Sequence, residues 1–206
     1  ARARQTAFLV PGLAIEITDE RAESQDESGV VPVHRFAYEG GLSEFVEFLA
    51  VDAPITDTWR VTDTGTFKET VPVVDEVYGG LVSREVERTC EVDIALRWGT
   101  GYDIEVQSFV NIIATPKGGT HMSGFEQGLT KFFRKQIEVN ARKLKAGSDK
   151  PDKDDILTGL TAVVTVRVPE PQFEGQTKEV LGTAAVRAIV SRAVVQGMTE
   201  RYESTK

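Results

Sequence analysis

The sequence predicts an α/β (α+β) fold in which long helices pack on one sheet. Three features lead to this expectation. Residues 92–98 alternate apolar with polar or small side chains, as a strand with one buried face does. Residues 160–168 are dense in β-branched side chains, which favour strands. Two later segments, starting near Gly118 and Thr183, place apolar residues at helical spacing instead.

Composition limits the class of protein. The chain has 206 residues, of which 40% are hydrophobic, and this is enough to bury a core. Its net charge of −8 argues against nucleic-acid binding by the whole surface, although residues 131–153 carry eight Lys or Arg. With no apolar run of about 18 residues, no membrane-spanning segment is expected. The single cysteine, Cys90, cannot form an internal disulfide, which fits a reducing cytoplasm.

The first part of the chain predicts a strand, a loop and a helix. Residues 7–18 contain a Pro-Gly turn followed by a strand pattern. Residues 19–34 are acidic and poor in apolar groups, which predicts an exposed loop. After Gly40-Gly41, residues 42–49 have the apolar spacing of a helix. Residues 54–90 are ambiguous and suggest short strands and loops.

The second half predicts an alternation of strands and helices. A turn after the 92–98 strand leads to residues 104–114, which become continuously apolar and predict a central strand. A helix is expected to reach about Lys145, followed by a charged loop over 147–155. The strand at 160–168 then leads through a proline-containing loop to a final helix, for which Thr183 is the expected N-cap.

Two loops have features of a binding site. Gly118-Gly119-Thr120-His121 opens a helix, where backbone N–H groups can approach an anion. A tight turn with His121 in the first helical turn is the interpretation we favour. The second loop contains Lys178 after a buried strand, which is a common place for a functional lysine. Most exposed lysines nevertheless have no role beyond solvation.

These segments resemble the ATPase subunits of type II DNA topoisomerases. Residues 108–119, continuing into Thr120-His121, are similar to one signature of that family. Residues 159–164, running into 171–178, are similar to the family's Gln-Thr-Lys loop. Residues 36–45 resemble the start of the family's second domain, and residues 7–18 the closing strand of its ATPase domain. The matches occur in family order through nearly the whole chain, and the bacterial gyrase B and topoisomerase IV B branch fits best.

The resemblance implies a fold and a site. It implies the family's transducer domain over residues 35–206, with a left-handed βαβ crossover. Residues 1–34 would be the C-terminal remnant of a Bergerat-type ATPase domain together with an acidic loop. Gln176 and Lys178 would contact the γ-phosphate of ATP, with Lys178 as the catalytic residue. The Mg²⁺ of the nucleotide would be held by the ATPase domain, so no metal ligand is assigned here.

The same resemblance implies an activity and partners. The parent enzyme would couple ATP binding and hydrolysis to DNA strand passage, whereas this fragment alone would be inactive. Its partners would be a DNA duplex, a DNA-cleaving A-type subunit and the ATPase domain of the same subunit. The parent would be a cytoplasmic heterotetramer without membrane association. Whether that parent is gyrase or topoisomerase IV stays open.

Other interpretations remain at this point. A coupling domain of a mismatch-repair or chaperone-type ATPase is the alternative within the same superfold. A stand-alone metabolite kinase would need its own phosphate loop, for which Gly118-Gly119 is too short. Residues 61–88 look longer and more acidic than the family pattern, and we assign them no role.

The basic segment 131–145 also has two interpretations. Five of its basic residues would line the cavity through which the family passes a DNA duplex, although a solvated helix face is the interpretation we favour: Lys131, Arg134, Lys135, Arg142 and Lys143.

Overall fold

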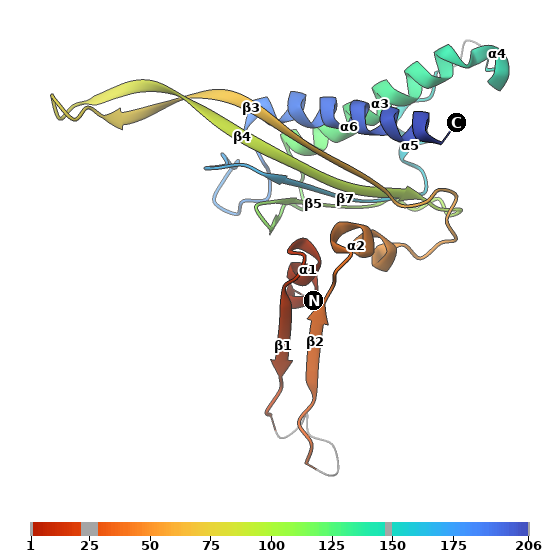
Figure 1. Ribbon diagram of the computed structural model, residues 1–206, viewed down its shortest axis with the longest axis horizontal. Coiled ribbons are helices and arrows are strands. Elements are labelled where there is room, and N and C mark those ends of the chain that lie inside the picture. Colours follow the sequence, from red (N-terminus) through yellow and green to blue (C-terminus); the bar gives the residue numbers. More distant parts are fainter. Residues whose placement is uncertain (1, 22–28, 147–149, 206) are drawn as a thin grey trace.

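A five-stranded sheet with helices on both faces forms the body of the molecule (Figure 1). The computed structural model describes residues 2–21, 29–146 and 150–205. In chain order the described elements are α1 (Arg2–Leu9), β1 (Ala14–Thr18), β2 (Val33–Ala37), α2 (Gly41–Leu49), β3 (Trp59–Val74), β4 (Leu81–Trp98), β5 (Glu105–Val110), β6 (Ile113–Ala114), α3 (Thr120–Val139), α4 (Ala141–Leu144), α5 (Lys153–Leu157), β7 (Leu160–Arg167) and α6 (Ala184–Ser204). None of the helices described is both long and apolar enough to cross a lipid bilayer.

The order of strands in the sheet is β3-β4-β7-β5-β6. All neighbours are antiparallel except β5 and β7, which pair in parallel with α3 between them in the chain. These three elements form a βαβ unit. The predicted fold class, a mixed sheet with helices packed on it, is therefore confirmed. The hand of the crossover stays a prediction of the resemblance.

Strand periodicity sorts the core into two layers. Ile94 and Val164 are register partners and point to the side of α3 and α6. The next pair along, Ala95 and Val163, points to the opposite side, where Phe8 of α1 and the apolar face of α2 cover the sheet. Because side chains alternate along a strand, both faces of β7 and of the inner part of β4, residues 92–96, are largely buried. This makes β7 the central strand of the molecule.

Glycines allow α3 and α6 to pack closely. A Cβ on Gly124 would lie 2.5 Å from the carbonyl oxygen of Arg187, and one on Gly128 would lie 2.7 Å from the Cβ of Val194. Both distances are far inside van der Waals contact, so only glycine fits at either position. The two helices therefore form one closely packed layer behind the sheet.

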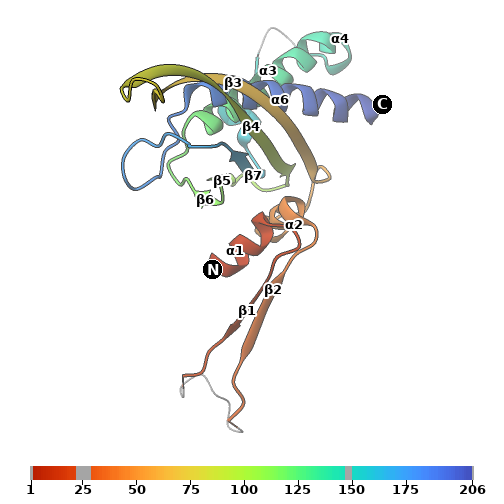
Figure 2. The same cartoon turned by 60° about the vertical axis from the view of Figure 1, so that its left-hand side comes forward.

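The N-terminal region differs in part from the sequence prediction. The predicted strand is present as β1, but it is preceded by α1, a helix that the sequence analysis did not predict. Residues 33–34 of the predicted loop belong to β2, which pairs with β1 in a hairpin that projects away from the sheet (Figure 2). Residues 22–28 of that loop lie outside the described residues. The boundary predicted at residue 34 falls inside β2, and it stays a prediction.

The prediction of short strands and loops over 54–90 is wrong. This segment forms most of β3 and β4, with 16 and 18 residues, which pair with each other. Only Glu91–Trp98 of β4 also pairs with β7, so the outer part of the two strands leaves the sheet as a two-stranded arm. Figure 1 shows this arm, residues 65–90, projecting well beyond the helices.

Three later predictions also differ from the structure. The apolar run 104–114 is not one central strand, because β5 ends at Val110 and a turn with positive φ at Asn111 and Ile112 leads to β6. The helix expected to reach Lys145 is broken at Asn140, between α3 and α4. Residues 147–149 of the predicted charged loop lie outside the described residues, and α5 begins at Lys153. The predicted strand at 160–168 and the final helix are confirmed as β7 and α6.

Candidate functional site

The segment between β7 and α6, residues 169–183, is a narrow hairpin-like loop that we call the lysine loop. Its two sides are joined by a bridge between Phe173 and Leu181. The N–H of Glu174 donates to the carbonyl of Val180 at 2.8 Å, and that of Gly182 to the carbonyl of Gln172 at 2.7 Å. These bonds define a paired base and leave residues 175–179 as a short tip. The tip therefore projects from a base that backbone hydrogen bonds hold in place.

The base of the lysine loop is bonded to the glycine turn that precedes α3. The N–H of Leu181 donates to the carbonyl of Gly118 at 3.1 Å, and the N–H of Thr120 donates to the carbonyl of Leu181 at 2.9 Å. A Cβ on Gly119, whose φ is +135°, would lie 2.4 Å from both the nitrogen and the oxygen of Leu181. Glycine is required there by close approach as well as by conformation. The two loops that the sequence suggested separately thus form one structural unit.

His121 lies inside the molecule rather than in a binding site. Its side chain is fully buried, and its Nε2 lies 3.0 Å from the hydroxyl of Thr115. That hydroxyl lies 2.8 Å from the hydroxyl of Ser108, so the three side chains form a buried chain. Burial lowers the pKa of His121 to about 4. A neutral, enclosed imidazole supports the turn interpretation of Gly118–His121.

The tip presents Gln176 and Lys178 to solvent. Both residues are exposed, and their side chains make no hydrogen bond or ion pair with any residue that the structure describes. Lys178 has a φ of +56°, a conformation that costs a non-glycine residue about 1 kcal/mol. A glycine would adopt it without that cost. Lys178 therefore combines a strained backbone with a side chain that has no partner among the described residues.

Glu179 follows Lys178 directly, but its carboxylate is occupied by other groups. Lys117 Nζ lies 2.7 Å from its Oε2, and the Thr177 hydroxyl donates to the same oxygen at 3.2 Å. The hydrogen bond from Lys117 is the main cause that lowers the pKa of Glu179. The neighbouring acid is therefore neutralised from outside the tip, which leaves the charge of Lys178 uncompensated. Sequence reasoning missed this role of Lys117, although the residue lies in the Thr-Pro-Lys-Gly-Gly segment of the family signature.

Asn111 fixes the start of the lysine loop. Its side-chain oxygen accepts from the N–H of Val168 at 2.9 Å, and its side-chain nitrogen donates to the carbonyl of Val168 at 2.7 Å. The side-chain amide of Asn111 thereby makes the two hydrogen bonds to Val168 that a neighbouring strand would make, one residue beyond the end of β7. This contact was also missed from the sequence, because no local pattern links Asn111 to a residue 57 positions later.

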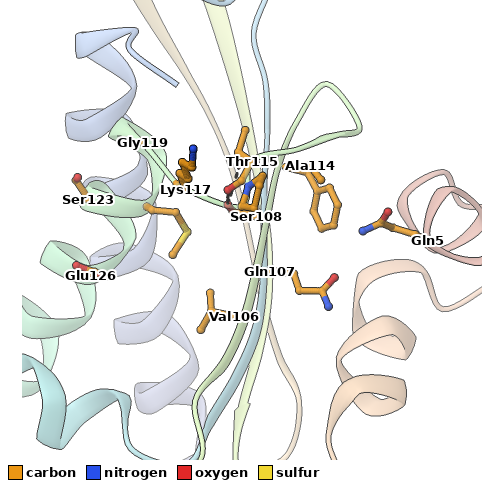
Figure 3. A pocket seen from close by; sticks show the side chains of 14 residues that line it. Gln5, Val106, Gln107, Ser108, Ala114, Thr115, Lys117, Gly119, Ser123 and Glu126 are labelled. Carbon is orange, nitrogen blue, oxygen red and sulfur yellow. Dashed lines mark hydrogen bonds between the residues drawn. The ribbon is translucent and has the colours of Figure 1, made fainter. Parts of the chain in front are cut away.

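A cavity of about 640 Å³ lies beside the glycine turn, between α1, β5 and the start of α3 (Figure 3). Gln5 points into it from α1, and Gln107, Ser108 and Lys117 line the opposite side. Neither Gln176 nor Lys178 lines this cavity. The predicted site residues thus belong to an open loop tip and not to an enclosed pocket.

The chemistry available at the tip is electrostatic. An ammonium and an amide N–H can bind an anion, while the carboxylate at the tip, Glu179, is bound to Lys117. Cys90 offers no nucleophile elsewhere, because it is fully buried and burial raises its pKa to about 12. Within the described residues, no group of three or more His, Cys, Asp or Glu is arranged to hold a metal ion.

The basic residues of segment 131–145 lie on the outer side of the helical layer. Of the five named in the sequence analysis, three are on α3 and two on α4, and all five are exposed: Lys131, Arg134, Lys135, Arg142 and Lys143. Lys131 borders an open groove of about 770 Å³ between α3 and α6, together with Arg187 and Arg192. The structure thus leaves this basic segment accessible to a partner.

Comparison with known proteins identifies the family. The family described as DNA gyrase B matches residues 41–206. The DNA gyrase B protein of Campylobacter jejuni is 37% identical over 202 residues, which are 98% of this chain and 22% of that protein. The corresponding protein of Streptomyces coelicolor is 34% identical over 209 residues, or 97% of this chain and 28% of that protein. The chain therefore spans about a quarter of the length of these relatives.

Solved structures give the same result. The 43K ATPase domain of Thermus thermophilus gyrase B, in complex with an aminocoumarin, has a TM-score of 0.65 and 26% identity, covering 99% of this chain and 47% of that one. The topoisomerase IV ATP-binding domain of Francisella tularensis has a TM-score of 0.64 at 23% identity, covering 98% of this chain and 46% of that one, and shows the fold alone. With most of its length matched by the family and by these relatives, the chain belongs to the DNA gyrase B family.

Proposed function

We propose that this chain is the energy-coupling part, the transducer domain, of the ATPase subunit of a type II DNA topoisomerase. Its task would be to couple ATP binding and hydrolysis to DNA strand passage, with Lys178 and Gln176 contacting the γ-phosphate of ATP. The observation that carries the proposal is the lysine loop, whose bonded base holds an unpaired cation and amide at an exposed tip. Membership of the DNA gyrase B family supports the same interpretation.

The tip residues fit a terminal phosphate. Lys178 is a cation without an intramolecular partner among the described residues, and Glu179, which would otherwise compete for it, is bound to Lys117. Gln176, two residues before Lys178 in the chain, can donate from its amide to a phosphate oxygen. ATP would supply a γ-phosphoryl group whose oxygens gain charge as it is transferred to water. The compact ammonium of Lys178 stabilises that charge, whereas Mg²⁺ and the adenine site belong to the ATPase domain.

The architecture explains how such a contact could be transmitted. The base of the lysine loop is continuous with β7 and α6 and is bonded to the start of α3. A force on the tip would therefore act on both helices and on the central strand. When hydrolysis removes the terminal phosphate, this contact weakens, and the position of residues 35–206 relative to the ATPase domain can change with the nucleotide state. In this proposal, residues 1–34 are the end of that ATPase domain.

The proposed partners follow from the same function. They are a DNA duplex, a DNA-cleaving A-type subunit and the ATPase domain of the same subunit, in a cytoplasmic heterotetramer. The exposed basic residues of α3 and α4 support a DNA-phosphate surface. Neutralising Lys131, Arg134 and Lys135 together should weaken DNA stimulation of ATP turnover and its salt dependence, because fewer counterions are released. Unchanged stimulation across a salt titration would favour a solvated helix face.

Lys178→Ala in the full-length parent enzyme tests the proposed role of the loop. Loss of one preorganised electrostatic donor should lower kcat for ATP hydrolysis by on the order of 10²–10³-fold. DNA binding without ATP should be preserved, because Lys178 lies on the loop tip and not on the basic segment of α3 and α4. Arginine should rescue poorly, since its planar fork differs from the compact ammonium. Steady-state ATPase with DNA present is the measurement, and a near-normal kcat would remove Lys178 from the mechanism.

A further inference from the structure

The β3–β4 arm contacts the lysine loop, a relation that the proposed function does not use. The arm leaves the sheet at the same end as the lysine loop, and both views show the two side by side (Figures 1 and 2). Residues 81–90 of β4 pair only with β3, because pairing with β7 begins at Glu91. The inner part of the arm is therefore free to interact with the chain that follows β7.

Arg88 makes this connection. Its Nη2 lies 2.5 Å from the Glu170 carboxylate, at the start of the lysine loop, and its Nε lies 3.3 Å from Glu69 on the facing strand of the arm. Gln172, two residues further into the loop, donates from Nε2 to Glu69 at 2.6 Å. The guanidinium of Arg88 and the amide of Gln172 thus share one carboxylate on the arm. We call these four residues the arm–loop cluster.

Within the cluster, the Arg88–Glu69 pair is more than a surface ion pair, whereas the side chain of Glu170 is 72% exposed. The side chains of Arg88 and Glu69 are only 19% and 16% exposed, so water screens their attraction less than at the open surface. The guanidinium of Arg88 also fixes the relative orientation of the two carboxylates it binds, because its planar fork holds two acceptors at set angles. Glu170, which it holds, has a φ of +50°, a strained conformation for a non-glycine residue. The cluster therefore holds the first turn of the lysine loop in a conformation that it would not favour by itself.

A second ion pair of the arm provides a comparison. Lys68 and Glu85 form an ion pair of 2.7 Å across β3 and β4, with both side chains more than half exposed. Like Arg88 with Glu69, this pair joins a cation to a carboxylate across the arm, but neither partner bonds to the lysine loop. The arm therefore has one ion pair that joins only its own strands and one cluster that also contacts the lysine loop.

We propose that Arg88 is a positioning residue for Lys178, acting through Glu170 and Gln172 to set the orientation of the lysine loop. The inference rests on the proposed function, because it assigns Arg88 to the same reaction. Arg88 itself touches no substrate. It fixes residues 170–172, from which the paired base and then the tip with Lys178 continue. Misplacing a charge that must meet a transition state lowers the rate without removing the substrate pocket.

The test compares Arg88→Gln with Lys68→Gln in the full-length parent enzyme. Arg88→Gln should lower kcat for ATP hydrolysis on the order of tenfold and leave KM for ATP close to its wild-type value. Lys68→Gln removes a cation from the same arm and should leave both constants unchanged. Arg88→Lys should recover part of the loss, because an ammonium can bind Glu170 or Glu69 but lacks the fork that spans both.

A double variant distinguishes positioning from a general structural effect. If Arg88 acts through Lys178, Arg88→Gln should cause no further loss of kcat in a Lys178→Ala background. An equal loss in both backgrounds, or equal losses for Arg88→Gln and Lys68→Gln, would overturn the proposal. Should Arg88→Gln fail to fold, Glu170→Gln carries the test with the same expected loss, because its side chain is 72% exposed. A normal kcat for Lys178→Ala would overturn the proposed function itself, whereas an affected Lys178→Ala with a normal Arg88→Gln would overturn only the positioning role.

Discussion

The base and the tip of the lysine loop differ in nearly every physical property. At the base, backbone groups are paired on both sides, and Gly119 approaches Leu181 so closely that no side chain fits. At the tip, Gly175 has open space around it, and the side chains of Gln176 and Lys178 have no partner in the described structure. One end of the loop is fixed by the fold, whereas the other is available to a ligand.

This difference indicates how the loop can report on a ligand. A flexible segment that carries a charge would lose conformational entropy when that charge binds a ligand, and this loss weakens the binding. A short tip with a hydrogen-bonded base loses less conformational entropy on binding. Any force on the tip passes to the elements that hold its base. Changes at the base should therefore affect folding first, and changes at the tip should affect activity first.

Gly119→Ala should give the largest effect on stability. The added Cβ would lie 2.4 Å from backbone atoms of Leu181, which cannot move without breaking the contact between the two loops. Overpacking and the positive φ together should lower the free energy of unfolding of the 206-residue chain by about 2–4 kcal/mol. Denaturant unfolding measures this loss.

Gly175→Ala is the matched control. This glycine also has a positive φ, of +82°, but nothing lies within 4 Å of its Cβ position. Only the backbone strain of about 1 kcal/mol should remain. Equal losses for the two variants would show that close packing at the base is not what distinguishes it from the tip.

His121 should make the stability of the folded chain depend on pH. Its pKa falls from 6.5 to about 4 on folding, so below pH 6.5 the unfolded chain binds a proton that the folded chain does not. The contribution of His121 to the free energy of unfolding is therefore fully present above pH 6.5 and is lost as the pH falls toward 4. Between pH 7.5 and 5 this contribution is about 2 kcal/mol.

The measurement is denaturant unfolding of wild type and His121→Gln at both pH values. Glutamine can still bond to Thr115 but does not titrate, so the variant should lose about 2 kcal/mol less on acidification. Parallel pH profiles for the two proteins would show that His121 is not the source of the effect.

Lys117→Gln should give the smallest effect, and one confined to activity. Without Lys117, the carboxylate of Glu179 is free to pair with the neighbouring Lys178. We expect a severalfold loss of kcat for ATP hydrolysis by the parent enzyme. Added salt should make this loss smaller, because it screens the attraction between exposed charges. Adding Glu179→Gln should restore the rate, since the competing charge is gone. A double variant no faster than Lys117→Gln alone would contradict this account of the tip.

Local patterns in the sequence predict the fold class and place Lys178 on its loop. The β-branched residues of β7 and the apolar spacing of α6 identify these elements, because both are buried in a regular way. The turn interpretation of Gly118–His121 is supported for the same reason, since the imidazole is enclosed by the core. The position of Gln176 and Lys178 at an exposed tip agrees with the prediction, while their contact with ATP stays a proposal.

The arm escapes prediction because charged residues occupy its half-buried positions. Glu69 and Arg88 stand where an alternating strand would have apolar side chains, and they are stable there because they bind each other and the lysine loop. Such pairing joins residues far apart in the chain and leaves no local pattern. The contacts of Asn111 with Val168 and of Lys117 with Glu179 escape prediction for the same reason.

The most direct test of the central claim compares two nucleotides on the full-length parent and its Lys178→Ala variant. ADP and a non-hydrolysable ATP analogue differ in the γ-phosphate, so a comparison of their dissociation constants isolates that group. If Lys178 contacts it, the variant should bind ADP as wild type does and bind the analogue about 10–100-fold more weakly, as expected for one charged hydrogen bond. Equal changes for both nucleotides, or no change for either, would contradict a contact between Lys178 and the γ-phosphate.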